Sequence, residues 1–317
     1  MLMEETRRFI KELGFLPGDA NDLPTSEKRF PDGAQYRVEI PSVEGPNALK
    51  AMVETTKEYG LDIHRVSQGS GIMLQTDEEI KEMAAISREE NMELSLFVGP
   101  RGTFDITPMQ RASAGQVAGL RSQGIDQLVY AIEDVKRACD LGIRGILVAD
   151  EGMLWLVNEA KNAGELPSDL VVKVSVQVAH ANPFSIKLME TIGADTYNVP
   201  TDLTLARLAT IRQAVDIPID IYIEAPDDIG GFIRHYDIPE IIRVAAPVYI
   251  KFGLRNAPNI YPSGTHLEDT AIKLTKERVR RAKIGLDLLN RYAPDYKTSK
   301  KGAEGLGLPQ ESRSPQQ

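Results

Sequence analysis

The feature that most constrains this chain is a series of β-strand patterns at regular intervals, with helical patterns between most of them. The clearest is VVKVSVQVAH at residues 171–180, where valines alternate with Lys173, Ser175 and Gln177 at the two-residue period of a strand. Strands that alternate with helices form parallel sheets, and eight such strands close most economically into a barrel. We therefore predict an α/β protein, a single-domain (β/α)8 TIM barrel. The predicted strands span residues 35–43, 62–69, 93–100, 144–150, 171–180, 195–200, 219–226 and 248–254.

An open, doubly wound sheet is the alternative fold. Such a sheet usually carries a glycine-rich phosphate turn after an early strand, and SQGSGIM after the second strand lacks the G-x-G-x-x-G spacing. The barrel is therefore favoured. Residues 1–34 are predicted to form an N-terminal helix and linker, and residues 35–297 the barrel. Residues 298–317 are polar and rich in Gly, Pro and Ser, and are predicted to be a disordered tail.

Charge and composition argue against several classes of protein. The formal net charge is −9, whereas nucleic-acid binding requires a concentrated basic surface. No apolar run approaches the ~20 residues of a membrane span, and the start MLMEETRRFIKELG has no apolar signal region. We expect a cytoplasmic protein whose partners are a small-molecule substrate and further copies of the chain in a homo-oligomer, rather than nucleic acid or a membrane.

Several strands combine an aliphatic face with a charged one. In a barrel the face toward the helices must be aliphatic, so the charged face points inward. The second strand is ambiguous, because either Arg65 and Ser67 or His64 and Gln68 face inward. Lone buried charges are costly, so the inward cations should pair with the inward acids. The cations are Arg37, Lys173 and Lys251, and the acids are Glu39, Asp220 and Glu224.

The carboxyl ends of the strands form the site in TIM barrels, which makes the polar residues there candidates for catalysis. Glu224 and Lys251 lie near these ends on adjacent strands, and predict a general acid or base with its charge partner. Glu39 is predicted to orient the substrate, and His180 to act as a second proton carrier. The predicted substrate-binding residues are Arg65, Gln177, Asn198, Tyr249, Arg101 and Arg255.

The connection at residues 101–124 is long and carries Arg101, Arg111 and Arg121. Loops of this length are usually functional or disordered, and arginines can clamp a carboxylate or phosphate. We expect this loop to close over a small polar substrate that is anionic or sugar-like.

Three other functions stay open. Lys251 could form a Schiff base with a carbonyl substrate, as in a lyase or aldolase. Glu224, Asp150 and His180 could hold Mg²⁺ or Mn²⁺, although Asp150 also suits the start of a helix. A non-catalytic metabolite-binding barrel is the third alternative. A serine hydrolase is not expected, because the sequence has no G-x-S-x-G motif.

The segment at residues 175–226 resembles peptidase family U32. The resemblance rests on Asn182, Gly193-Ala194-Asp195, Leu203 and Leu205. It implies a TIM-barrel-like fold and a U32 peptidase-like enzyme, which we expect to be an acid/base hydrolase or lyase. Family members typically continue with HGALC and further cysteines that in several cases hold an iron–sulfur cluster. This chain has EAPDDIGGFIRHYDIPEII instead, and its single cysteine, Cys139, excludes such a cluster.

Overall fold

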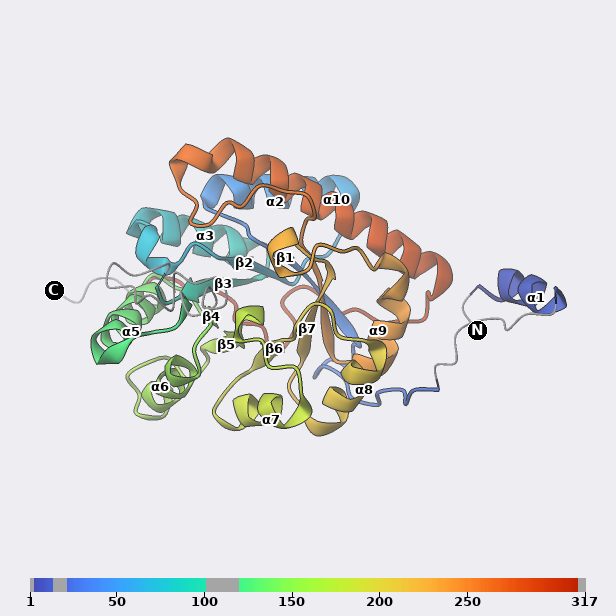
Figure 1. The fold of residues 1–317 in the computed structure, drawn as a ribbon. Helices are drawn as coiled ribbons and strands as arrows, with labels where there is room; N and C mark the ends of the chain where they lie inside the picture. The colour runs from blue at the N-terminus through green and yellow to red at the C-terminus, as the bar shows by residue number, and fades with distance from the viewer. Residues whose placement is uncertain (1–2, 14–21, 101–119, 313–317) are drawn as a thin grey trace.

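The computed structural model describes residues 3–13, 22–100 and 120–312. Parallel strands close into a barrel in the order β1 to β8 (Figure 1). The predicted (β/α)8 barrel is confirmed, and each strand lies within its predicted range. The strands are β1 (Tyr36–Pro41), β2 (Arg65–Gln68), β3 (Glu93–Val98), β4 (Gly145–Val148), β5 (Val171–Val174), β6 (Thr196–Asn198), β7 (Ile219–Glu224) and β8 (Val248–Phe252).

Helices follow the strands along the chain and cover the outside of the barrel (Figure 1). Local sequence sets their ends: Thr76 and Glu79 form a capping box at the start of α3, and Gly60 ends α2 with a left-handed φ of 62°. The long helix α10 packs along α2, whereas α1 lies apart from the barrel and buries none of its residues. The described helices are α1 (Glu4–Glu12), α2 (Pro46–Tyr59), α3 (Asp77–Glu89), α5 (Gly124–Asp140), α6 (Glu151–Asn162), α7 (Pro183–Thr191), α8 (Leu205–Ala214), α9 (Ile238–Ala245) and α10 (Glu268–Tyr292).

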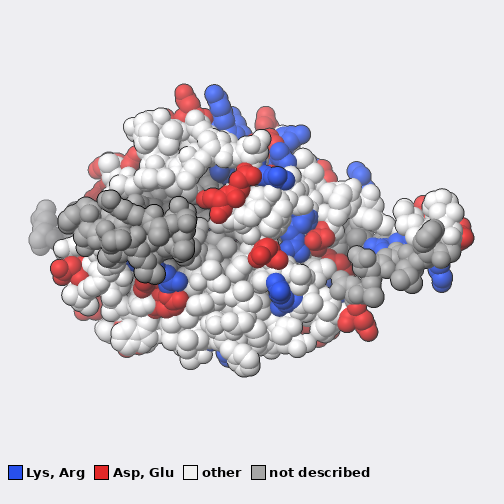
Figure 2. All heavy atoms as spheres, in the orientation of Figure 1, with Lys and Arg blue, Asp and Glu red and all other residues white. Residues whose placement is uncertain are grey.

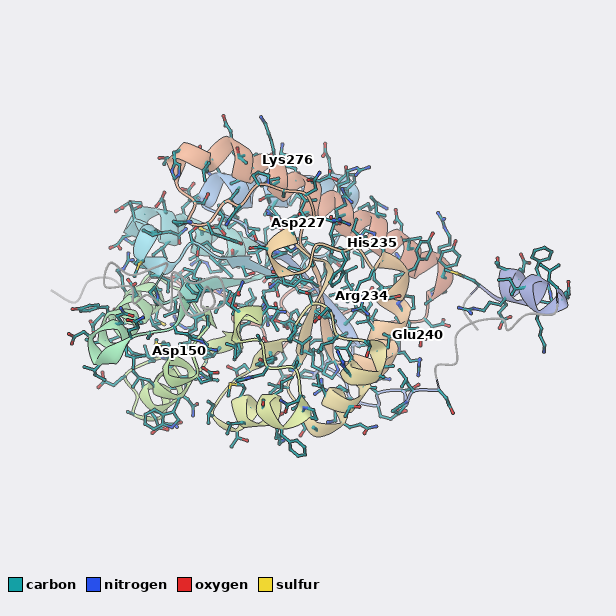
Figure 3. All side chains as sticks on the ribbon, in the orientation of Figure 1. Asp150, Asp227, Arg234, His235, Glu240 and Lys276 are labelled. Atoms are coloured by element: carbon teal, nitrogen blue, oxygen red, sulfur yellow. The ribbon has the colours of Figure 1, made fainter. Side chains whose placement is uncertain are left out.

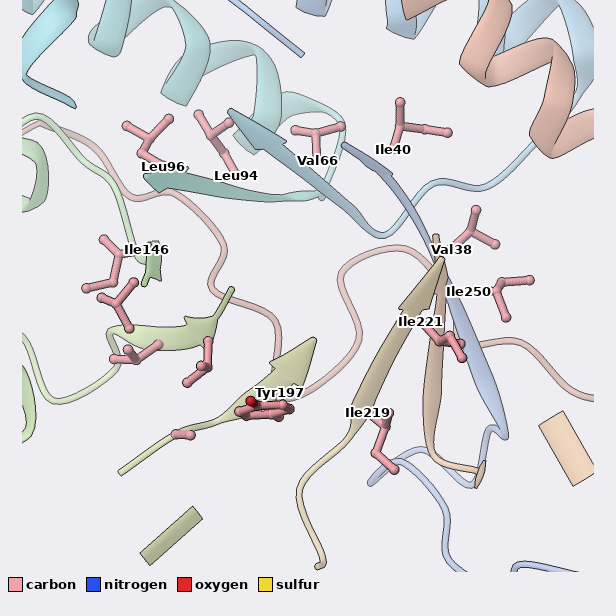
Figure 4. Close-up of a cluster of buried hydrophobic side chains, with 14 of the residues drawn as sticks. Val38, Ile40, Val66, Leu94, Leu96, Ile146, Tyr197, Ile219, Ile221 and Ile250 are labelled. Carbon is pink, nitrogen blue, oxygen red and sulfur yellow. The ribbon is translucent and has the colours of Figure 1, made fainter. Parts of the chain in front are cut away.

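The hydrophobic core lies between the strands and the helices. Figure 4 shows aliphatic strand residues of this core, including Val38, Ile40 and Ile250, all of them buried. Side chains alternate along a strand, so the residues between them point into the barrel. Glu39 pairs with Lys251 of β8 and with Arg65 of β2, which places these three side chains on the same inner face.

Strand β5 is shorter than predicted. It ends at Val174, because the Ser175 side chain accepts a hydrogen bond from the Gln177 backbone and begins a 3-10 turn, η3 (Val176–Val178). Lys173 therefore points into the barrel from the strand itself. Gln177 reaches the mouth from the turn and not from an extended strand.

An irregularity in β7 changes the side to which its last residue points. Tyr222 is opposite Lys251 on β8, whereas Glu224 is opposite Phe252, so two steps along β7 match only one step along β8. Such a bulge turns the following side chain away from the face that simple alternation predicts. Tyr222 remains on the inner face, and Glu224 leaves it.

The chain after α10 differs from the predicted disordered tail, because residues 298–312 pack across the amino-terminal end of the barrel. The backbone N–H of Gly307 donates to Glu93 Oε2 at 3.1 Å. A Cβ at Gly307 would lie 2.3 Å from the carbonyl oxygen of Arg144, so only glycine fits there. The prediction failed because it considered apolar content alone, whereas polar contacts with the barrel end hold this segment.

None of the described helices combines the length and the apolar composition that crossing a membrane would require.

Candidate active site

Ionised side chains pair with one another inside the barrel. Lys173 contacts Glu39, and its Nζ lies 2.9 Å from Asp220 Oδ2. Arg65 Nη1 lies 3.0 Å from the same Asp220 oxygen, and Arg65 Nε lies 2.6 Å from Glu93 Oε1. Three cations thus balance three acids, all of them buried. We call these six residues the ionic layer: Arg65, Lys173, Lys251, Glu39, Glu93 and Asp220.

The pairing of inward cations with acids is as predicted for Lys173 and Lys251, but not for Arg37. Arg37 lies near the amino-terminal end of β1 and donates to Ser299 Oγ at 2.9 Å and to the Glu304 carbonyl at 2.7 Å. These two partners come from the C-terminal segment, and Arg37 Nη1 also donates to the Tyr249 hydroxyl of β8 at 3.1 Å. Strand β2 directs Arg65 and Ser67 inward, which resolves the ambiguity of that strand.

Glu39 is the central acid of the ionic layer. Its Oε1 lies 3.2 Å from Lys251 Nζ and accepts a hydrogen bond from Ser67 at 2.8 Å. Burial alone would raise the pKa of Glu39, but the charges of Lys173, Lys251 and Arg65 outweigh it and lower that pKa. Glu39 is therefore a carboxylate that holds these cations in place.

A cavity of about 540 Å³ opens at the carboxyl ends of the strands. Lys251 is only 3% exposed and presents its ammonium group at the inner end of this cavity. Its Nζ donates to Asn198 Oδ1 at 2.8 Å and lies 4.5 Å from the centre of the Tyr222 ring. The polar and charged residues that line the cavity are Ser42, Ser67, Gln68, Ser175, Gln177, Asn198, Tyr222, Asp227, Asp228, Lys251, Asn259, Tyr261 and Arg278.

Acidic residues stand at the rim of this cavity. The turn η4 (Asp227–Ile229) follows β7, and Figure 3 labels Asp227 at its start. Asp227 accepts a hydrogen bond from the Asn256 backbone and pairs with Arg255, whose Nε lies 3.6 Å away. Asp228 has no ion pair within the described residues. Acidic side chains are visible near the middle of this face in Figure 2.

Lys251, Gln177 and Asn198, which the sequence singled out, line the cavity together. Other predicted residues do not. Arg65 and Tyr249 do not line the cavity and lie deeper in the barrel. They pack against each other there, with the Arg65 guanidinium carbon 3.7 Å from the centre of the Tyr249 ring. Arg255 is exposed at the rim and paired with Asp227. Arg101 and most of the predicted covering loop, residues 101–119, lie outside the described residues.

Glu224 does not reach the cavity, so its predicted pairing with Lys251 is wrong. Its Oε1 accepts a hydrogen bond from the Arg255 backbone at 2.9 Å. Its Oε2 faces the barrel exterior, 3.4 Å from Arg281 of α10 and 3.8 Å from His235 Nε2. Burial raises the pKa of Glu224, which the Arg255 N–H and Arg281 oppose. The bulge in β7 is the physical reason for this orientation.

The structure does not bring together the metal ligands that the sequence suggested. Asp150 caps α6, with its Oδ1 accepting from the Met153 backbone at 2.9 Å. His180 Nε2 lies 3.0 Å from Glu151 Oε1, and Glu151 also contacts Arg121. His180 therefore pairs beside the cavity and does not line it. Among the described residues, no group of three His, Cys, Asp or Glu side chains could hold a metal ion.

Two residues important to the cavity were missed as site residues. Tyr222 lies beside Lys251, a position that follows from the pairing of β7 with β8. Arg278 comes from α10, on the same buried face as Thr275, Val279 and Ala282. The sequence could have indicated Arg278 as a site residue, because this arginine falls on the buried face of a helix.

The fold and this cavity define a TIM-barrel protein with an ionised interior and a polar site at the carboxyl ends of its strands. Residues 119–225 match the model of peptidase family U32. Over these residues the chain is similar to that family, and the resemblance seen in residues 175–226 is confirmed. The match runs from just before α5 to the end of β7.

Some solved structures resemble the chain at low sequence identity and with TM-scores below 0.5. The U32 peptidase Mk0906 is 15% identical with a TM-score of 0.43, over 76% of this chain and 100% of that one. The carboxyl transferase domain of Rhizobium etli pyruvate carboxylase is 12% identical with a TM-score of 0.44, over 94% of this chain and 53% of that one. No curated protein sequence matches the chain. These likenesses carry no information about the substrate.

Proposed function

We propose that this protein is an enzyme that performs acid/base chemistry, hydrolytic or eliminative, on a small oxygen-rich substrate bound in the mouth cavity. The observation that carries the proposal is the position of Lys251, whose ammonium group lies at the inner end of the cavity with Glu39 and Asn198 holding it. A fixed cation in a largely desolvated place stabilises negative charge that develops on a substrate oxygen, and needs no reorganisation to do so.

Two further groups of the cavity suit the transfer of a proton. Asp228 stands at the rim and, among the described residues, has no ion pair that would occupy it. We assign it the role of general base or acid. Burial, with Glu39 next in effect, raises the pKa of Tyr222, so its phenol stays protonated at neutral pH and can donate a hydrogen bond to the substrate. Glu224, outside the cavity, has no part in this scheme.

The test is turnover of a metabolite mixture, read by mass spectrometry, with Lys251→Met against the wild type. Loss of one charge-stabilising donor lowers kcat by about 100- to 1000-fold. Lys276→Met is the matched control, because Lys276 is an exposed lysine on the outer side of α10 (Figure 3). Full turnover by Lys251→Met would contradict the assignment of Lys251. Binding of a compound that the wild type never converts would favour a metabolite-binding barrel instead.

A Schiff-base lyase is the second candidate, and the near-complete burial of Lys251 favours it. A lysine amine shielded from water at the inner end of a cavity can attack the carbonyl of an enclosed substrate. The contact of Lys251 with Glu39, 3.2 Å away, favours instead the charge-stabilising role proposed above. Borohydride added with pyruvate should then increase the mass of the peptide that contains Lys251. An unchanged mass for that peptide across a panel of aldehydes and ketones would exclude this candidate.

A further inference from the structure

Arg278 is a buried cation that differs from those of the ionic layer. It extends from α10 to the cavity wall and is 4% exposed. Its Nη1 donates to the carbonyl oxygen of Ser42 at 3.1 Å, and its Nε has no hydrogen-bond partner. Within the described residues, no carboxylate forms an ion pair with Arg278. The cations of the ionic layer, in contrast, are matched by an equal number of acids.

An unpaired buried charge is costly, so proteins seldom keep one without a compensating group. Burial accordingly lowers the pKa of Arg278. Glu44 is the buried acid whose charge acts on Arg278 from a distance, and its oxygens already accept from the Gly69 and Ser70 backbone N–H groups at 2.7 and 3.1 Å. The charge of Arg278 therefore has no direct carboxylate partner among the described residues, and a ligand anion in the cavity could supply one.

The loop after β1 is built to hold this arginine without neutralising it. Ser42 has a left-handed backbone with φ of 60°, which is uncommon for residues other than glycine. Its carbonyl oxygen accepts from Arg278, and its hydroxyl group accepts from Tyr261. One neutral carbonyl fixes the guanidinium and leaves its remaining N–H groups for a ligand. A planar guanidinium binds carboxylate and phosphate oxygens in pairs.

We propose that Arg278 is a specificity-determining residue that binds an oxyanion of the substrate, a carboxylate or a phosphate, while Lys251 holds the reacting oxygen. The substrate is then a small acid with a second oxygen function, such as a hydroxy acid, a keto acid or a sugar phosphate. This inference rests on the proposed function, because it places the anionic end of the same substrate at the cavity wall.

The test measures binding by calorimetry with pyruvate, malate and glycerol 3-phosphate as anionic compounds and dihydroxyacetone as a neutral one. At least one anionic compound should bind the wild type, and Arg278→Gln should weaken that binding by about tenfold or more. Arg278→Lys keeps the charge but loses the paired geometry of the guanidinium, so its affinity for the anion should lie between those of the wild type and Arg278→Gln. Whether malate or glycerol 3-phosphate binds more tightly distinguishes carboxylate from phosphate. Lys276→Gln, on the exposed face of the same helix, should bind like the wild type.

A structural role predicts different results. If Arg278 only held the loop, Arg278→Gln would lower the Tm of the ligand-free protein and weaken all four compounds alike. Because the buried charge lacks a counter-ion, we expect the ligand-free variant to keep its Tm or to gain stability. Equal affinity of Arg278→Gln and wild type for every anion would overturn the inference, as would a wild type that binds none of them. If Lys251→Met lost turnover while Arg278→Gln bound anions like the wild type, the proposed function would be supported and the role of Arg278 would be refuted.

Discussion

Substitution of Glu39 by glutamine should destabilise the fold more than any exposed charge substitution. Glu39 contacts Lys173, lies 3.2 Å from Lys251 and 3.4 Å from Arg65, and is fully buried. Glu39→Gln changes the ionic layer from three acids against three cations to two against three. Removing one partner of a buried ion pair leaves an uncompensated charge and costs about 3–5 kcal/mol. We expect the free energy of unfolding to fall by about that amount.

The assay is urea unfolding at neutral pH, with Glu151→Gln as the control. Glu151 also contacts two basic side chains, Arg121 and His180, but its side chain is 32% exposed. Exposed or partly exposed pairs contribute about 0–1 kcal/mol, so this variant should stay within that range. A loss below about 1 kcal/mol for Glu39→Gln would refute the reasoning, since the ionic layer would then not depend on charge balance.

The pH dependence of stability is a second test of whether Glu39 stabilises the fold through its charge. Its pKa is lowered in the folded state, so its contribution to stability is present above the unfolded pKa and is lost as pH falls through the folded pKa. The wild type should therefore lose its advantage over Glu39→Gln as the solution is acidified. An advantage that stays constant from neutral pH into the acid range would show that Glu39 acts through packing instead.

Two further predictions concern residues whose roles the structure changed. Glu224→Gln should retain turnover and lie within about 1 kcal/mol of the wild type at neutral pH, because glutamine still accepts from the Arg255 N–H. Its stability relative to wild type should rise with pH, since the raised pKa of Glu224 makes the folded state favour the protonated acid and lose stability as pH rises through that pKa. Removal of Ser299 and all later residues should lower the unfolding free energy by at least about 3 kcal/mol, because Arg37, His64 and Glu93 each lose a buried partner. Abolished turnover in the first variant or an unchanged urea midpoint in the second would contradict these expectations.

The barrel and the direction of most strand side chains could be predicted because both follow from periodicity. Aliphatic residues must face the helices, so the position of Lys173 follows from alternation alone. Alternation fails where the backbone departs from regular pairing. The bulge between Tyr222 and Glu224 has no glycine or proline that would indicate it in the sequence, and it moved the favoured catalytic residue out of the cavity.

The depth of each inward side chain along the barrel axis could not be predicted from the sequence either. Arg65, Glu39 and Lys251 all point inward, but only Lys251 reaches the cavity. Which inward residue lies highest depends on the stagger between strands, and that stagger is a property of the closed barrel. Arg278 was missed for a different reason, since it comes from a helix rather than from a strand end.

The distribution of charge in the cavity explains how an acidic chain could accept an anion. The net charge of −9 repels anions at long range, and Asp227 and Asp228 add to this at the rim. The two cations, Lys251 and Arg278, lie deeper and are 3% and 4% exposed. Solvent and salt screen the exposed rim more than the buried cations, so attraction dominates once a small ligand has entered. An anionic group would thus bind inward, with the rest of the substrate toward Asp228, which is the orientation that proton transfer at the rim requires.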